Sequence, residues 1–255
     1  AAKELKYKRV AMIADDIAYG YELNAGFQRA FEDAGGKVVQ KLWPPLNAPD
    51  YGTYIAQLKT NVDAIFIGFA GSNGLKFLRQ YKEYGGKIPL LGGMTAIDES
   101  LLRQMGDEAI GSLSTCWYSA QLDNESNKKL VGGMQRDYRV DPGFYAAATY
   151  TNGAVLEAAL RQIGAKIEDK DALMKALRAI KVEETCRGPV QFDKYGNVVG
   201  NIYIRKVEKK GSALVNSVIK TYPNVSQFWT YDADEFLKKP VYNRESWPEN
   251  KNLEP

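Results

Sequence analysis

The 255-residue chain carries 34 lysines and arginines against 31 aspartates and glutamates, a formal net charge of +3, and it contains no histidine. So small a charge does not predict a nucleic-acid partner, and without histidine the chain lacks the commonest general base and metal ligand. Its two cysteines, Cys116 and Cys186, are too few for a four-thiolate metal site, and no apolar run is long enough to span a membrane.

The first 118 residues alternate short apolar runs with amphipathic segments. The apolar runs predict strands at residues 10–14, 37–42, 63–67, 88–91 and 110–118. Between them, apolar stripes predict helices around residues 23–34, 50–58, 75–81 and 98–104, and the first five residues also have a helical pattern. This β-α alternation predicts an α/β fold, a parallel sheet with right-handed crossovers and helices on both faces.

The pattern changes after residue 118. Three helices are predicted in succession, at residues 124–138, 144–163 and 169–180, with no strand between them. Their apolar faces need a sheet to pack on, which this stretch does not supply, so we expect the chain to be a portion of a longer protein. Strands are then predicted at 188–193, 200–207 and 212–222, the first two around a turn at 194–197, before a tail rich in aromatics and prolines.

Two features that could carry chemistry have plainer interpretations. Gly68, Gly71 and Gly74 have the spacing G-x-x-G-x-x-G, not the dinucleotide fingerprint G-x-G-x-x-G. We interpret them as permitting a sharp turn and close backbone approach, with N–H groups at the helix start open to an acceptor such as a carboxylate. Asp15 and Asp16 are adjacent and diverge, so one is expected to cap a helix and the other to face solvent. No activated nucleophile or acid–base pair is recognisable, so we predict no catalytic residue, metal or cofactor.

Aromatic and small residues recur where the predicted strands end. Each alone is typical of a core, but the carboxyl ends of parallel strands meet at one edge of a sheet, where α/β proteins bind ligands. Together they predict an apolar, flat-sided pocket with few polar anchors. The six residues are Tyr19, Phe69, Ala70, Met94, Trp117 and Tyr118.

An ordered set of motifs along the chain resembles a known family. The motifs are KRVAMIADDIAYG from residue 8, DAIFIG from 63 with LRQY from 78, PLLGG from 89, MGDEAIGSLS from 105, DNESNKKLV from 123 and RGPVQFDKYGN from 187. In this order they resemble the periplasmic solute-binding proteins of ABC transporters, in the branched-chain amino-acid (Leu/Ile/Val) class. The stretch YPNVSQFWTYD from 222 is similar to the subgroup that carries non-amino-acid substrates, often aromatic acids.

The resemblance implies a type I periplasmic-binding-protein (Venus-flytrap) fold. Residues 1–118 with 201–230 would form one complete lobe, 119–200 part of the other lobe, whose N-terminal sheet is missing from this chain, and 231–255 an extended tail. The hinge crossings would lie at 118–119 and 200–201. Both cysteines would then lie near the hinge, so the resemblance allows a Cys116–Cys186 disulfide, whereas spacing alone favours two buried thiols.

The resemblance also implies a function. A small organic acid would bind between the lobes, hinge closure would bury it, and the closed form would dock on a membrane permease in the periplasm. Amino-acid binders of this class hold the ammonium group with an acid in the loop matched by residues 92–95 and use a tyrosine in the loop matched by 69–71. This chain has Met94 and Ala70 or Gly71 there, which favours an aromatic acid over an amino acid, while Tyr19 matches the family's tyrosine in the first loop. The expected ligand contacts are Tyr19, Phe69, Ala70, Gly71, Met94, Thr95, Trp117 and Tyr118.

Two further expectations remain. A ligand-sensing regulator of the same fold is the alternative function, and an enzyme is disfavoured because residues for chemistry are missing. The incomplete lobe would expose an apolar surface, through which a homodimer could form. No nucleic-acid partner is expected.

Overall fold

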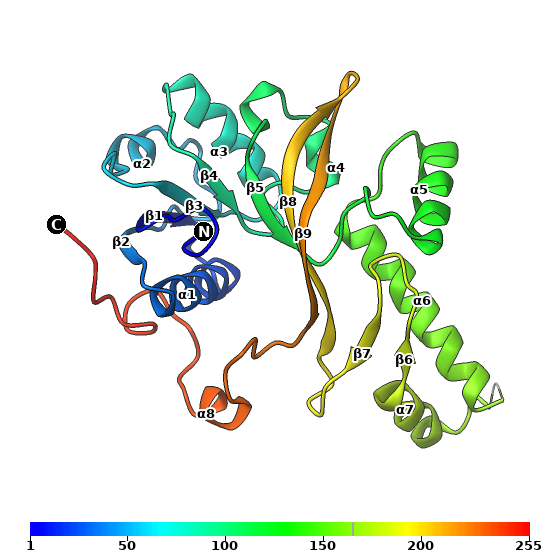
Figure 1. Cartoon of the computed structure of the whole chain (residues 1–255). Coiled ribbons are helices and arrows are strands. Elements are labelled where there is room, and N and C mark those ends of the chain that lie inside the picture. Colours follow the sequence, from blue (N-terminus) through cyan, green and yellow to red (C-terminus); the bar gives the residue numbers. More distant parts are fainter. Residues whose placement is uncertain (165) are drawn as a thin grey trace. The chain divides into compact units, whose positions relative to one another are not determined.

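The computed structural model describes residues 1–164 and 166–255 (Figure 1). The chain divides into two compact units. Unit 1 comprises residues 1–114, 209–214 and 238–255, and unit 2 comprises residues 115–208 and 215–237. The lobe boundaries expected from the family's crossovers stay a prediction.

Unit 1 is built on the parallel sheet that the sequence predicts. Its strands run in the order β2–β1–β3–β4–β5, and every neighbouring pair is parallel. Because neighbouring strands are parallel and β1 lies inside, the strands must be joined by crossover connections, which helices supply here. The strands are β1 (Arg9–Ala14), β2 (Lys37–Leu42), β3 (Ala64–Gly68), β4 (Leu90–Gly92) and β5 (Leu113–Cys116).

Helices follow the strands of unit 1, and apolar side chains fill the space between helix and sheet. On one face, Phe27 of the first helix stacks on Phe66 of β3 with ring centroids 4.2 Å apart, beside the buried Phe31, Val10 and Met12. Alternation along the strands sends the remaining side chains to the other face. The helices are α1 (Ala18–Asp33), α2 (Gly52–Gln57), α3 (Ser72–Glu83), α4 (Glu99–Leu102) and the 3-10 helix η1 (Asp107–Ala109).

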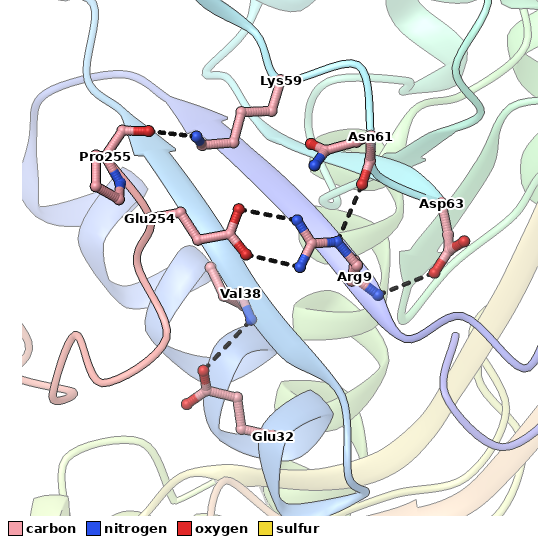
Figure 2. Close-up of polar contacts among 8 residues, drawn as sticks. All are labelled: Arg9, Glu32, Val38, Lys59, Asn61, Asp63, Glu254 and Pro255. Atoms are coloured by element: carbon pink, nitrogen blue, oxygen red, sulfur yellow. Dashed lines mark hydrogen bonds and ion pairs between the residues drawn. The ribbon is translucent and has the colours of Figure 1, made fainter.

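The C-terminal segment, residues 238–255, belongs to unit 1. Figure 2 shows its end beside β1 and β2, where both carboxylate oxygens of Glu254 accept hydrogen bonds from the Arg9 guanidinium, at 2.7 and 2.9 Å. Lys59 Nζ donates to the carbonyl of Pro255 at 2.5 Å. These polar contacts fasten a segment that is remote in sequence to the first strands of the sheet.

Unit 2 begins with the three predicted helices, and its strands are antiparallel. β6 pairs with β7 and β7 with β8, around a turn in which the Asp193 side chain accepts hydrogen bonds from the main-chain N–H groups of Tyr195 and Asn197, both at 2.9 Å. β9 pairs with β8. The elements are α5 (Glu125–Tyr138), α6 (Phe144–Gln162), α7 (Lys170–Ala179), β6 (Lys181–Val182), β7 (Val190–Phe192), β8 (Val198–Lys210), β9 (Ala213–Val225) and α8 (Ala233–Leu237).

Several local features differ from the sequence pattern, among them η1, which was not predicted. The first five residues form turns, and the predicted helix there is wrong: Leu5 N donates to Ala1 O, but Lys6 at φ +60° leaves the helical conformation. The two-residue strand β6 and the one-and-a-half-turn helix α8 were not predicted, because neither is long enough to show a period. Across residues 1–164 and 166–255, no helix is long and apolar enough to cross a membrane.

Candidate functional site

A chain of hydrogen bonds joins three of the predicted ligand contacts at the carboxyl edge of the unit 1 sheet. The hydroxyl of Tyr19, on α1, lies 2.6 Å from Thr95 Oγ1, in the loop after β4. Thr95 Oγ1 in turn donates to the carbonyl of Phe69, after β3, at 2.6 Å. Because the single Thr95 hydroxyl proton is used on Phe69, Tyr19 is the donor to Thr95. The first turn of α1 and the loops after β3 and β4 are thus held together, as parallel-strand topology predicts.

Asp15, directly after β1, forms a second set of hydrogen bonds at the same edge of the sheet. It is fully buried, and its carboxylate accepts hydrogen bonds from Ala70 N at 2.7 Å and from Asn73 Nδ2 at 2.8 Å. Burial raises the pKa of Asp15, and the bonds from Ala70 and Asn73 offset part of that rise. The helix-capping role expected for this residue pair is wrong, because Ile17 is the N-cap of α1 and makes no side-chain cap bond.

Asp16 is half-buried rather than facing solvent, which corrects the second expectation for the pair. Its two oxygens accept from the Tyr21 hydroxyl at 2.7 Å and from the Arg244 guanidinium at 2.9 Å. Neither acid is therefore arranged for acid–base work. Asp15 braces the β1 and β3 loops, and Asp16 helps to hold the C-terminal segment.

The glycines after β3 permit a sharp turn and a close backbone approach, as predicted. Gly71 has φ +52° immediately before α3, and a Cβ on Gly74 would lie 2.7 Å from the Cα and O atoms of Ala96. The predicted open N–H groups are partly used inside the loop, because Asn73 N and Gly74 N donate to the carbonyls of Ala70 and Gly71 at 3.2 Å. The start of α3 thus offers a ligand fewer donors than the sequence implied.

The remaining predicted ligand contacts of unit 1 differ in their exposure to solvent. The Phe69 ring is fully buried against Tyr51 and Phe77, with ring centroids 5.1 and 4.8 Å away, which leaves only its main chain for a ligand. Ala70 and Met94 are half-buried. Gly71 is exposed. As ligand contacts, all of these residues stay predictions.

The two aromatic contacts predicted at the end of β5 belong to unit 2 and have different surroundings there. Tyr118 is fully buried, and its hydroxyl donates to Asn127 Oδ1 at 2.8 Å, so its ring is a core group. Trp117 is half-buried, with the ring of Phe144 edge-on at 5.8 Å. On the same indole lies the Arg187 guanidinium, whose central carbon is 4.1 Å from the ring centroid.

Arg187 and Trp117 line a cavity of about 440 Å³ within unit 2. Its walls are mainly apolar, and of the described residues that line it Arg187 alone is charged. Burial lowers the pKa of Arg187 to about 10. Arg187 lies in the RGPVQFD motif that resembles the family, but it is not among the predicted ligand contacts. An arginine before Gly-Pro is typical of an exposed turn, so the sequence gives no signal that this one is buried.

The two cysteines are buried thiols and form no disulfide with each other, so the Cys116–Cys186 bond that the resemblance allowed is wrong. Cys186 Sγ is engaged by α6: it lies 3.3 Å from Thr151 Oγ1 and donates to Ala147 O at 3.4 Å. Burial raises the pKa of Cys186, which disfavours the reactive thiolate. Among residues 1–164 and 166–255, no cluster of three or more His, Cys, Asp or Glu side chains could hold a metal ion.

Comparison with known proteins decides the family. The sequence profile described as "Periplasmic binding protein" matches residues 1–212. The chain belongs to this family. It is 29% identical over 226 residues to the Leu/Ile/Val-binding protein homolog 6 of Brucella melitensis, covering 84% of this chain and 57% of that protein. To the leucine-, isoleucine-, valine-, threonine- and alanine-binding protein of Pseudomonas aeruginosa it is 27% identical, covering 77% of this chain and 52% of that protein.

Solved structures of this periplasmic binding protein family share the fold. An ABC transporter substrate-binding protein from Sphaerobacter thermophilus superposes with a TM-score of 0.83 at 30% identity, over 88% of this chain and 62% of the other. A solute-binding protein from Rhodopseudomonas palustris BisB5 in complex with 3,4-dihydroxybenzoic acid has a TM-score of 0.81 at 32% identity. The match covers 88% of this chain and 63% of that chain. Another solute-binding protein from R. palustris, in complex with 4-hydroxybenzoate, has a TM-score of 0.79 at 28% identity, and the match covers 88% of this chain and 62% of that chain. The chain thus spans less than two thirds of each relative, and the predicted type I fold is confirmed.

Proposed function

We propose that this chain is a portion of the extracytoplasmic solute-binding component of an ABC importer, and that the ligand is a small aromatic acid. The observation that carries the proposal is the likeness to two solute-binding proteins whose structures contain 3,4-dihydroxybenzoic acid and 4-hydroxybenzoate, at 32% and 28% identity. The complete protein would work in the periplasm and deliver its ligand to a membrane permease.

The loop chemistry supports an aromatic acid over an amino acid. An α-ammonium group needs a carboxylate that is free to pair with it, and the position matched to that acid in the family is a thioether, Met94. Asp15, the buried acid at this edge, already accepts hydrogen bonds from Ala70 and Asn73. Tyr19 instead offers a half-buried aromatic ring, which suits a flat ligand.

Braced loops suit a binding protein because they keep a site in its binding geometry before the ligand arrives. The bonds that Asp15 and Thr95 make across three loops supply such bracing in unit 1. Closure of the predicted hinge would then depend on the ligand binding the closed state more tightly than the open one.

Isothermal titration calorimetry on the complete protein that contains this chain tests the proposal with 4-hydroxybenzoate, 3,4-dihydroxybenzoate, benzoate and leucine. We expect saturable binding of at least one of the acids with a micromolar or lower Kd and no heat from leucine. Preference for leucine, or failure of all three acids to bind, overturns the proposal. Light scattering at the same concentrations tests the predicted homodimer, which requires twice the 28.4 kDa chain mass.

A further inference from the structure

A strap of irregular chain lies along α1 and the edge strand β2 of unit 1 (Figure 1). It comprises residues 242–255, which form neither helix nor strand. Side chains of α1 hold it: Arg29 donates to the Tyr242 hydroxyl at 2.7 Å, and Glu32 Oε1 accepts from Asn252 Nδ2 at 2.7 Å. These contacts are polar and only partly buried, so a single pair can be removed without opening the core.

One contact of the strap reaches the loop between β1 and α1. Arg244 Nη1 donates to Asp16 Oδ2 at 2.9 Å, and the Tyr21 hydroxyl donates to the other carboxylate oxygen at 2.7 Å. The main chain of Asp16 is held as well, because its N–H donates to the carbonyl of Pro44 at 2.9 Å. Asp16 therefore joins the strap, α1 and the segment that follows β2.

This loop fixes where the first turn of α1 begins. A side chain at the N-cap usually does so, but Ile17 makes no such hydrogen bond. The two carboxylates before it hold the loop instead. Asp15 is buried and accepts from Ala70 N, whereas Asp16 is half-buried and pairs with the strap. Tyr19 follows in the first turn, so the position of its ring is linked to both carboxylates.

We propose that Arg244 is a positioning residue for ligand binding, which acts through Asp16 to hold Tyr19 in its binding position. The inference rests on the proposed function and goes beyond it, because it assigns a role in ligand affinity to a residue 228 positions after Asp16 in the chain. A loop that already has its binding geometry loses less conformational entropy when the ligand arrives. The Arg244 and Asp16 side chains are 51% and 25% exposed, so their ion pair is partly screened and adds little to stability while it restricts the loop.

Calorimetry on the complete protein that contains this chain tests the inference with 4-hydroxybenzoate. The variants are Arg244→Met, which removes the charge and keeps an apolar stem, Tyr19→Ala, and the two combined. We expect Arg244→Met to weaken binding by about 2- to 5-fold, the range that corresponds to an exposed ion pair. In the Tyr19→Ala background the same change should leave the Kd as it is, because the ring that Arg244 positions is gone.

Two single variants separate positioning from a general effect on the protein. Arg244→Lys keeps the charge that pairs with Asp16 and should recover most of the affinity, and added salt should weaken binding more in the parent protein than in Arg244→Met. Arg9→Met removes the bidentate pair with Glu254 at the other end of the strap (Figure 2). This variant should bind the acid as the parent does, because the pair lies at the amino end of β1 and the predicted site lies at the carboxyl end.

Backbone hydrogen exchange provides a measurement that needs no ligand. The amide protons of Asp16 and Tyr21 both form main-chain hydrogen bonds. They should exchange about 2- to 5-fold faster in Arg244→Met than in the parent protein, since the loop opens more often without the strap contact. Arg9→Met should leave both rates unchanged.

The outcomes distinguish this inference from the proposed function. If the parent protein binds the acid and Arg244→Met has the same Kd, or weakens binding equally with and without Tyr19, the inference is overturned and the proposed function stands. If the parent protein binds no aromatic acid, both are overturned. Exchange rates at Asp16 and Tyr21 that do not change in Arg244→Met also overturn the inference, whatever the calorimetry shows.

Discussion

Replacing Asp15 by alanine should destabilise unit 1 although it removes a buried charge. Ala70 N would lose its carboxylate acceptor, and an orphaned buried N–H costs about 1–3 kcal/mol. Asn73 Nδ2 would lose one bond but keep another, to Leu46 O at 2.8 Å, so its loss is about 1 kcal/mol. Relief from burying the carboxylate offsets part of this, because burial raises the pKa of Asp15. The net destabilisation at neutral pH is about 1–3 kcal/mol.

Urea unfolding followed by circular dichroism measures this difference, with Asp171→Ala, at an exposed aspartate of α7, as the control. The pH dependence gives the sharper test. The native state holds the Asp15 proton to a higher pH than the unfolded chain does, so the stabilising contribution of Asp15 is complete at low pH and is lost as the pH rises through the raised pKa. The penalty of Asp15→Ala should therefore be larger at about pH 4 than at neutral pH. A penalty that grows with pH, or no penalty beyond that of Asp171→Ala, would refute this reasoning.

Three further predictions concern the same loops and the thiols. Thr95→Val should lower the free energy of unfolding by about 1–2 kcal/mol, since one hydroxyl carries two hydrogen bonds; denaturation equal to the parent chain would contradict this. Gly74→Ala should cost about 1–3 kcal/mol or more through overpacking, whereas Gly26→Ala, with nothing within 4 Å of the new Cβ, should be neutral or stabilising in the same assay. Alkylation under denaturing, non-reducing conditions should add two adducts by mass, at Cys116 and Cys186, and an unmodified protein would demonstrate a disulfide.

Much of unit 1 could be predicted because its signals are local. Buried parallel strands are short apolar runs, as in residues 10–14, and their order along the chain implies one sheet edge for the loops. The sequence could not predict which residues far apart in the chain form hydrogen bonds with each other. Asp15 and Ala70 are 55 residues apart, and nothing in either segment indicates that a buried carboxylate would brace the other loop rather than cap its own helix.

The candidate site shows the same limit. Tyr19 and Thr95 were predicted by position, and the structure joins them, but it buries the rings of Phe69 and Tyr118 in the cores, since aromatic residues at strand ends suit either place. Arg187 was missed because its isolation depends on α6, β7, β8 and Trp117 meeting around it. Charge and burial of this kind are properties of the assembled unit and not of a motif.

Native mass spectrometry of the complete protein that contains this chain, with equimolar 4-hydroxybenzoate and leucine, tests the central claim most directly. An aromatic-acid binding protein should give a one-to-one adduct with the mass of 4-hydroxybenzoate and none with leucine. A leucine adduct, or only the unliganded chain at concentrations that saturate micromolar binders, would contradict the account.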